Sequence, residues 1–311
     1  MKAFENRNWW ALILGGSSGF GLATAKALAL EGMHICVVHR DRRGALERIE
    51  REFAEIRGAG VQLKTYNLDA LDAAVRTNLL DTLKAELGSG TIRLMLHSIA
   101  LGSVRPLARP ITTKSDAVPV LAAELGLKPE ILQTKINELF TKGEDALHAL
   151  VQTTGGADDL VLDDEELART VQAMGTSLYS WARGVWERGL FTADARVIGL
   201  TSEGNQIAWY GYAAVSAAKA ALEAMSRSIA REFGAYGIRS NIIQAGVTDT
   251  PALRLIPGHQ KLMARARIRN PLGRLTETED VARVIALLCR DEAAWINGSL
   301  IRVDGGECIS G

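Results

Sequence analysis

The feature that most constrains the fold is a regular alternation of short apolar runs with longer helical stretches. Such apolar runs are typical of buried strands. The expected strands are Ala11–Leu14, Ile35–Val38, Val61–Asn67, Leu94–Ile99, Arg196–Thr201, Arg239–Gln244 and Ser299–Val303. The expected helices between them are Gly21–Glu31, Ala45–Arg57, Ala70–Leu87, Asp164–Arg188, Tyr212–Phe233 and Glu279–Cys289. Repeated strand–helix–strand units predict an α/β fold, a Rossmann-type doubly wound parallel sheet with right-handed crossovers.

The alternation breaks after Arg105 and Pro106. Residues 112–162 contain no convincing strand, and short helices are expected at Ser115–Leu125, Pro129–Phe140 and Glu144–Val151. We therefore expect a single domain over residues 1–311, with a helical insertion at about 112–162 after the fourth strand. Ligands bind at the carboxyl ends of parallel strands, so we expect the insertion to be a lid over the substrate. An oligomer contact is the alternative.

Composition excludes several classes of function. The chain has 36 basic and 36 acidic residues among 311, so no overall field would attract nucleic acid or an anionic membrane. The polar stretch before Trp9 is too short and badly flanked for a signal peptide, and no apolar run is long enough to span a membrane. Three cysteines without metal-ligand spacing fit a reducing cytoplasm. The five histidines show no metal spacing either, and we expect no metal.

A glycine-rich segment, Gly15-Gly-Ser-Ser-Gly-Phe-Gly21, lies between the first strand and the first helix. Glycine lets the backbone turn sharply and approach a pyrophosphate, while the helix N-terminus offers free N–H groups. An ordinary turn is the alternative, but the position after the first strand favours a dinucleotide site. The expected phosphate-binding residues are Gly15, Ser17, Ser18, Gly19, Phe20 and Gly21.

The second strand ends in a charged run from His39 to Arg43. Arginines there suit a 2′-phosphate through charge-assisted hydrogen bonds, which predicts NADPH, with Arg40 first and Arg42 or Arg43 in support. Asp41 leaves NADH possible, and a solvated charge run is the alternative without a ligand. Asn67 and Leu68, which end the third strand, are expected near the adenine.

Tyr212 and Lys219 lie seven positions apart in an expected helix. Seven residues are about two turns, so both side chains fall on nearly the same face. A lysine ammonium favours phenolate, so we expect Lys219 to lower the pKa of Tyr212 and make it a better proton donor. The structural alternative is that Tyr212 caps the helix and Lys219 reaches solvent.

Together, the glycine segment, Ser202, Tyr212, Lys219 and Val303-Asp-Gly-Gly306 resemble the short-chain dehydrogenase/reductase family. The resemblance covers roughly residues 9–106 and 164–306. Most of that family has tyrosine four residues before lysine, a position that Val215 occupies here. The seven-residue offset and the segment His97-Ser-Ile-Ala100 resemble the enoyl-acyl carrier protein reductases of bacterial fatty acid synthesis. The phosphate segment is similar to that of their NADPH-using branch.

The resemblance implies a reductase that transfers hydride from NADPH to the β carbon of a trans-2-enoyl thioester carried by acyl carrier protein or coenzyme A. Tyr212, Lys219 and Ser202 would be catalytic, and Tyr210 would line the acyl pocket. The implied cofactor contacts are Ser98, Ile99, Ala100, Lys219, Thr248 and Thr250, and the other pocket residues are Leu101 and Leu253. Gly175-Thr-Ser177 stands where the family has an asparagine. A homotetramer or homodimer is also implied.

Several signals have plainer explanations. His97 is expected to be a satisfied core residue or a group that positions the backbone rather than a base. The basic stretch Arg254, Lys261, Arg265, Arg267 and Arg269 is either a docking patch for acidic acyl carrier protein or a solvated helix face. For the whole chain, the alternatives are another reductase, acting on a ketone or a 3-oxoacyl thioester, and a non-catalytic nucleotide-binding protein.

Overall fold

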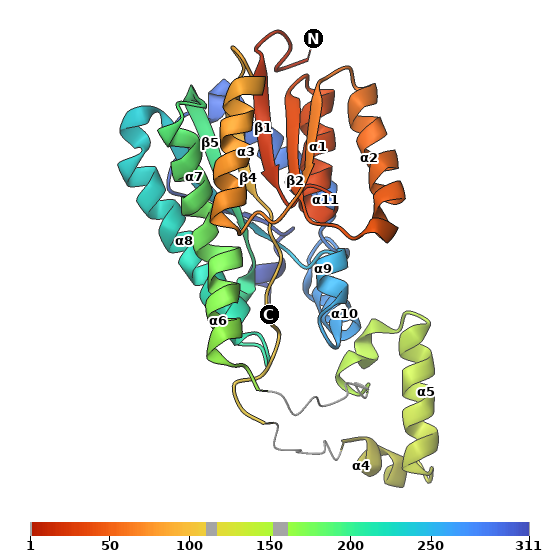
Figure 1. The fold of residues 1–311 in the computed structure, drawn as a ribbon. Helices are drawn as coiled ribbons and strands as arrows, with labels where there is room; N and C mark the ends of the chain where they lie inside the picture. Colours follow the sequence, from red (N-terminus) through yellow and green to blue (C-terminus); the bar gives the residue numbers. More distant parts are fainter. Residues whose placement is uncertain (1, 110–116, 152–160, 311) are drawn as a thin grey trace.

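The computed structural model describes residues 2–109, 117–151 and 161–310. Its centre is a seven-stranded, all-parallel sheet in the order β3-β2-β1-β4-β5-β6-β7 (Figure 1). The strands are β1 Trp9–Leu14, β2 His34–His39, β3 Leu63–Asn67, β4 Thr91–His97, β5 Phe191–Thr201, β6 Ile238–Ala245 and β7 Leu300–Val303. The predicted doubly wound parallel sheet is confirmed, and each predicted strand is present.

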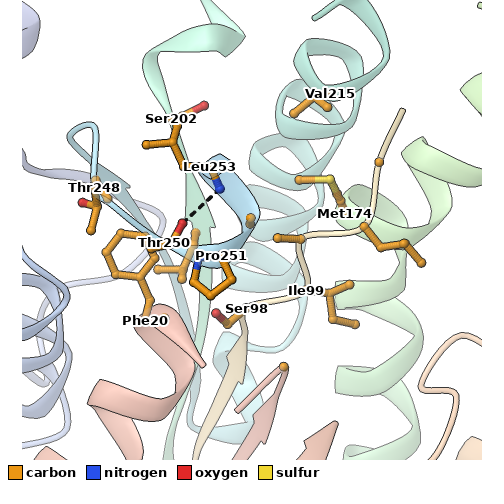
Figure 2. Close-up of a pocket in the computed structure, with 18 of the residues that line it drawn as sticks. Phe20, Ser98, Ile99, Met174, Ser202, Val215, Thr248, Thr250, Pro251 and Leu253 are labelled. Carbon is orange, nitrogen blue, oxygen red and sulfur yellow. Dashed lines mark hydrogen bonds between the residues drawn. The ribbon is translucent and has the colours of Figure 1, made fainter. Parts of the chain in front are cut away.

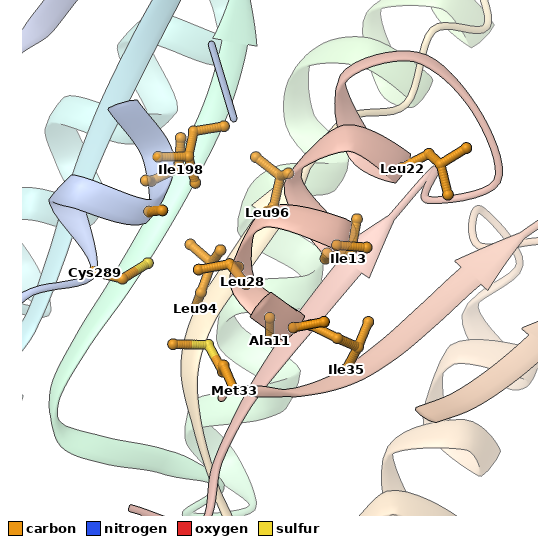
Figure 3. Packing of buried hydrophobic residues seen from close by; sticks show 14 of the residues in the cluster. Ala11, Ile13, Leu22, Leu28, Met33, Ile35, Leu94, Leu96, Ile198 and Cys289 are labelled. Atoms are coloured by element: carbon orange, nitrogen blue, oxygen red, sulfur yellow. The ribbon is translucent and has the colours of Figure 1, made fainter. Parts of the chain in front are cut away.

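Helices cover both faces of the sheet. They are α1 Gly19–Leu30, α2 Leu46–Gly58, α3 Ala73–Glu86, α7 Ser177–Glu187, α8 Ala213–Glu232 and α11 Thr278–Leu288. Side chains alternate along each strand, so β1 gives Ala11 and Ile13 to one face and Leu12 and Leu14 to the other. The first face packs against α1, α2 and α11, and Figure 3 shows its cluster of buried aliphatic side chains. The second packs against α3, α7 and α8, with Trp181 fully buried.

The long helix expected over Asp164–Arg188 is interrupted. α6, Asp164–Val171, passes into a π-helical turn, η3, at Gln172–Thr176, and α7 follows. Hydrogen-bond spacing widens in such a turn, and π turns are frequent at functional sites. Hydrophobic periodicity in the sequence does not distinguish this turn from continuous helix.

The region after β4 is helical, as expected. It contains α4 Ala117–Glu124, α5 Pro129–Thr141 and the 3-10 turn η2 Asp145–Ala149, while the ends of the predicted insertion lie partly outside the described residues. In Figure 1, α4 and α5 lie away from the sheet, beyond α10, His259–Arg269. η2 contacts α10, where Asp145 forms a two-bond ion pair with Arg267 at 2.5 and 2.7 Å. We call residues 117–149 the α4–η2 segment.

None of the helices in the described ranges is long and apolar enough to cross a membrane.

Candidate active site

A cavity of about 580 Å³ opens at the carboxyl ends of the strands, where a doubly wound sheet binds its ligands (Figure 2). Its wall is formed by the ends of the central strands, the start of α1, one face of α8 and the chain after β6. The predicted site residues that line it are Gly15, Ser17, Ser18, Gly19, Phe20, Arg40, Leu68, Ser98, Ile99, Ala100, Leu101, Ser202, Tyr212, Lys219, Thr248, Thr250 and Leu253. Gly21, Asn67 and Tyr210 are not part of the wall.

The phosphate segment needs its glycines. Gly15 has a φ of +85°, and a Cβ there would lie 2.5 Å from the Ser98 carbonyl oxygen. A Cβ on Gly21 would lie 2.2 Å from the Gly15 carbonyl oxygen, so Gly21 closes the turn onto α1 from behind the wall. Ser18, the N-cap of α1, makes no side-chain capping bond. The first turn of α1 therefore presents backbone N–H groups that a phosphate can accept.

The end of β2 is held by side-chain hydrogen bonds. Arg40 donates to the Asp69 carboxylate at 2.6 Å, and the His39 Nδ1 and Asp41 Oδ2 atoms are 2.9 Å apart. Asn67 bonds both the backbone N–H and the carbonyl of Asp41, at 3.0 Å each. Asn67 therefore positions this turn and does not itself line the cavity, whereas Leu68 does.

Arg42 and Arg43 are exposed and lie outside the cavity wall. Arg40 is thus the arginine of this run that faces the cavity.

Tyr212 is the N-cap of α8, one residue before the helix begins, and Lys219 lies two turns into the helix. Both line the cavity, so the seven-residue offset does bring them to one site. Burial lowers the pKa of Lys219 to about 8, and its Nζ donates to the Leu200 carbonyl at 2.7 Å.

The pKa of Tyr212 shifts opposite to expectation. Burial raises it, because the phenolate is disfavoured away from water, and the neighbouring Ser202 hydroxyl opposes that shift without cancelling it. The predicted lowering by Lys219 is therefore wrong for the protein in this state: the ammonium is bonded to a backbone carbonyl instead.

Ser202 follows β5 and lines the cavity (Figure 2). Its Oγ is buried and makes no hydrogen bond of good geometry among the described residues, although the hydroxyl lies near enough to Tyr212 to act on its pKa. The Gln244 Oε1, also on the wall, is unpartnered in the same way. Buried polar atoms without partners carry a free-energy cost that a ligand can relieve. A polar ligand thus fits this part of the cavity.

Tyr210 lies outside the cavity, 72% exposed, and donates to the Ala108 carbonyl at 3.3 Å. The structure therefore does not place Tyr210 in the cavity where the acyl pocket was expected. Trp209 lines the cavity instead, with its ring centroid 5.2 Å from that of Tyr212. Trp209 was not predicted as a site residue, although a large aromatic side chain three residues before Tyr212 was the available signal. With Met174 and Val215 it forms an apolar wall.

His97 is fully buried outside the cavity, and its Nε2 lies 2.7 Å from the Ser177 Oγ. Burial and the nearby Lys219 charge lower the pKa of His97 to about 3, so the ring is neutral. The prediction of a satisfied core histidine is confirmed. Ser177 in turn donates to the Ala173 carbonyl at 2.9 Å, within the π turn. Within the described ranges, no group of three or more His, Cys, Asp or Glu side chains could hold a metal ion.

Comparison with known proteins identifies the family. A family model described as "Enoyl-(Acyl carrier protein) reductase" matches residues 129–307, more than half of the chain, and one described as "short chain dehydrogenase" matches residues 9–118. The chain belongs to the short-chain dehydrogenase/reductase superfamily. It is therefore an oxidoreductase of that superfamily, as the resemblance implied.

Individual relatives of this short-chain dehydrogenase/reductase differ in their activities. It is 25% identical to a tropinone reductase homolog of Arabidopsis thaliana, over 97% of this chain and 91% of the relative. It is 28% identical to a probable 2,4-dienoyl-CoA reductase of Bacillus subtilis, over 96% of each chain. The enoyl-acyl carrier protein reductase of Bacillus cereus, solved with NADP+ and an indole naphthyridinone, superposes with a TM-score of 0.74 over 100% of both chains at 22% identity, a likeness of fold.

Proposed function

We propose that this short-chain dehydrogenase/reductase is an NADPH-dependent enoyl thioester reductase that acts in fatty acid synthesis. The observation that carries the proposal is the placement of Tyr212 in the cavity, seven residues before the buried Lys219, with Val215 on the wall at the offset of four. A phenol hydroxyl is thus available seven residues before Lys219, at Tyr212, whereas Val215, four residues before it, has none.

A nicotinamide dinucleotide fits the residues present. Its pyrophosphate would lie on the phosphate segment. Arg40 would donate hydrogen bonds to a 2′-phosphate in exchange for part of its bond to Asp69. The unpartnered Ser202 Oγ gives the cavity a free polar group at its other end. When bound, the cofactor supplies the hydride. Arg40 and Asp41 both line the wall, and each is paired, Arg40 with Asp69 and Asp41 with His39. We propose NADPH because a 2′-phosphate could replace the Asp69 carboxylate as the partner of Arg40.

The offset has a chemical reason. In an enoyl thioester, negative charge develops on the thioester oxygen, several bonds away from the β carbon that is reduced. The acid must therefore stand farther from the reacting carbon than in ketone reduction. Tyr212 lies one helical turn beyond Val215 and would donate its hydroxyl hydrogen bond to that oxygen. Lys219 would stabilise the charge from two turns away, while Trp209, Met174 and Val215 exclude water from the acyl side.

The substrate would be carried by acyl carrier protein or coenzyme A in the cytoplasm. The basic stretch has fewer unpaired positive charges for an acidic carrier protein than its sequence suggests. Arg254, Arg267 and Arg269 are each paired with carboxylates. Docking of an acidic carrier would depend on Lys261 and Arg265. The α4–η2 segment, tied to α10 by Asp145, would act as the lid.

Ketone reduction is the second candidate, because Ser202 keeps its unpartnered hydroxyl on the wall and one relative is a tropinone reductase homolog. NADPH oxidation with crotonyl and acetoacetyl thioesters in parallel separates the candidates. Turnover of the crotonyl thioester supports the proposal. Turnover of the acetoacetyl thioester alone would select the ketone reductase, and NADPH binding without turnover would select a non-catalytic nucleotide-binding protein.

A further inference from the structure

A buried cluster of charges lies at the end of the cavity away from Arg40. Arg269 donates to Glu203 at 2.5 Å and, from the same nitrogen, to Glu307 at 3.3 Å. The three side chains are 12%, 10% and 3% exposed, respectively. Charged groups are rarely buried so completely unless they are paired, because burial of a charge costs free energy. The pairing therefore indicates a structural role for this cluster at the site.

The three residues come from separate parts of the chain. Glu203 immediately follows Ser202, Arg269 is the last residue of α10, and Glu307 begins the 3-10 turn η7, Glu307–Ile309, after β7. Glu203 and Glu307 also line the cavity. The cluster therefore joins the loop that carries Ser202 to α10 and to the C-terminal turn.

Glu307 has a second bond that reaches the chain after β6. Its Oε2 accepts the backbone N–H of Val247 at 3.0 Å. The chain after β6 is packed closely on this carboxylate, since a Cβ on Gly246 would lie 2.7 Å from the same oxygen. Val247 and Thr248 both line the cavity, so Glu307 fixes the backbone of a segment that faces the ligand.

The order of the strands places the Val247–Thr248 segment where the nicotinamide half of a bound dinucleotide would lie. β2 and β3, which carry Arg40 and Leu68 at their ends, lie on one side of β1, whereas β4 to β7 lie on the other. A dinucleotide across the switch point between β1 and β4 would place its adenosine half over β2 and its nicotinamide half near Lys219 and Val247.

Arg269 offsets part of the negative charge that the carboxylates of Glu203, Asp304 and Glu307 bring to this cluster. Burial raises the pKa of Glu307, and the Glu203 and Asp304 carboxylates add to that shift, while the Val247 N–H and Arg269 oppose it. Without the Arg269 guanidinium, the buried carboxylates of Glu203 and Glu307 would lie close together with no positive charge between them.

We propose that Glu307 and Arg269 are positioning residues that hold the Val247–Thr248 segment in the shape that receives the nicotinamide half of the cofactor. Neither touches the reacting atoms. The inference rests on the proposed nicotinamide cofactor, and it predicts a defect confined to one half of that molecule.

The test measures binding of two probes by titration calorimetry: NADPH, and 2′-phospho-ADP-ribose, which lacks the nicotinamide. Glu307→Leu removes the acceptor of the Val247 N–H, so we expect NADPH to bind about tenfold more weakly, as for the loss of one charge-assisted hydrogen bond. The affinity for 2′-phospho-ADP-ribose should be unchanged. The matched variant Glu307→Gln keeps an acceptor oxygen, and its NADPH affinity should stay within about threefold of the wild type.

Arg269→Gln, which keeps a donor but removes the charge, gives a second route if Glu307→Leu does not fold. It should weaken NADPH binding about tenfold and leave the fragment unaffected. Unchanged NADPH affinity in the folded variants would overturn the inference, and so would an equal loss for both probes. Failure of the wild type to bind NADPH would instead contradict the proposed function.

Discussion

Lys219 gives the site a pH dependence that can be measured. Burial lowers its pKa to about 8, so the free enzyme loses the ammonium as the pH rises through that value. The pKa of Tyr212 is raised, so Tyr212 does not account for a loss near pH 8. We predict that kcat/KM for NADPH falls above a pH of about 8, because this ratio reports the groups of the free enzyme.

A pH–rate profile of wild type and Lys219→Arg checks this prediction. Guanidinium stays charged, so the variant, although less active, should lose the alkaline limb. A wild-type profile without a fall around pH 8 would contradict the assigned role of Lys219.

At the scale of single residues, the sequence predicted most of the cavity wall but not the direction of every side chain. Glycine spacing and the order of the strands placed Gly15, Ser202 and Lys219 correctly, because strand ends converge at one edge of a parallel sheet. Tyr210 was misplaced because it precedes α8, where helical periodicity carries no information. Hence Trp209 was missed.

Among the elements, β4 and β5 are tied together near their amino ends, on the side of the sheet opposite the site. Asp194 of β5 accepts from Arg93 at 2.7 Å and from Arg196 at 2.6 Å, and both arginines are almost fully buried. Although burial opposes ionisation, the hydrogen bonds from Arg196 and Arg93 lower the pKa of Asp194 to about 2.

We predict that Asp194→Asn lowers the free energy of unfolding by about 3 kcal/mol at neutral pH, since it leaves the buried Arg196 without its carboxylate partner and Arg93 with Asp291 alone. The folded pKa of Asp194 lies below its unfolded value, so its contribution is present above a pH of about 4 and is lost as the pH falls towards 2. Denaturant unfolding at several pH values measures the difference. A gap between wild type and variant that persists at pH 2 would contradict this account.

The α4–η2 segment meets the rest of the protein through η2 and α10. If it acts as a lid, Asp145→Arg, which opposes Arg267, should raise KM for a long-chain enoyl thioester several-fold and leave crotonyl turnover nearly unchanged. The double variant Asp145→Arg/Arg267→Asp restores the pairing and should restore KM. Steady-state kinetics with both substrates decide it, and equal KM values in all three proteins would argue for an oligomer contact instead.

The elements themselves were largely predictable. Strands and helices alternate with distinct hydrophobic periods, and those periods located β1 through β7. The π turn was not predictable, because it arises from tertiary packing: Gly175 lies so close to α8 that a Cβ would be 2.8 Å from the Ala218 carbonyl oxygen. α9, Pro251–Arg254, was not expected either, and α10 was only an alternative for a basic stretch.

The whole molecule exposes apolar side chains around the edge strand β7. Trp295 is 96% exposed, and Leu287, Ile296 and Leu300 are also exposed nearby in the chain. An open strand edge beside such a surface favours pairing with a second copy. We propose that this surface is the interface of the homotetramer or homodimer that the family resemblance implies.

Trp295→Glu should therefore lower the oligomeric state, because it would bury a charge in that interface. Light scattering after size exclusion measures the mass, and Tyr236→Glu, at a side chain 56% exposed on another turn, serves as the control. An unchanged mass for Trp295→Glu would place the interface elsewhere.

The central claim for the molecule is that Tyr212, displaced by one helical turn, serves the thioester oxygen of an enoyl substrate. NADPH oxidation with crotonyl thioester by wild type, Tyr212→Phe and Tyr210→Phe tests it most directly. We predict that Tyr212→Phe loses at least about 100-fold in kcat, while Tyr210→Phe, whose hydroxyl lies outside the cavity, remains close to wild type. Full activity of Tyr212→Phe, or loss of activity in Tyr210→Phe alone, would contradict the account.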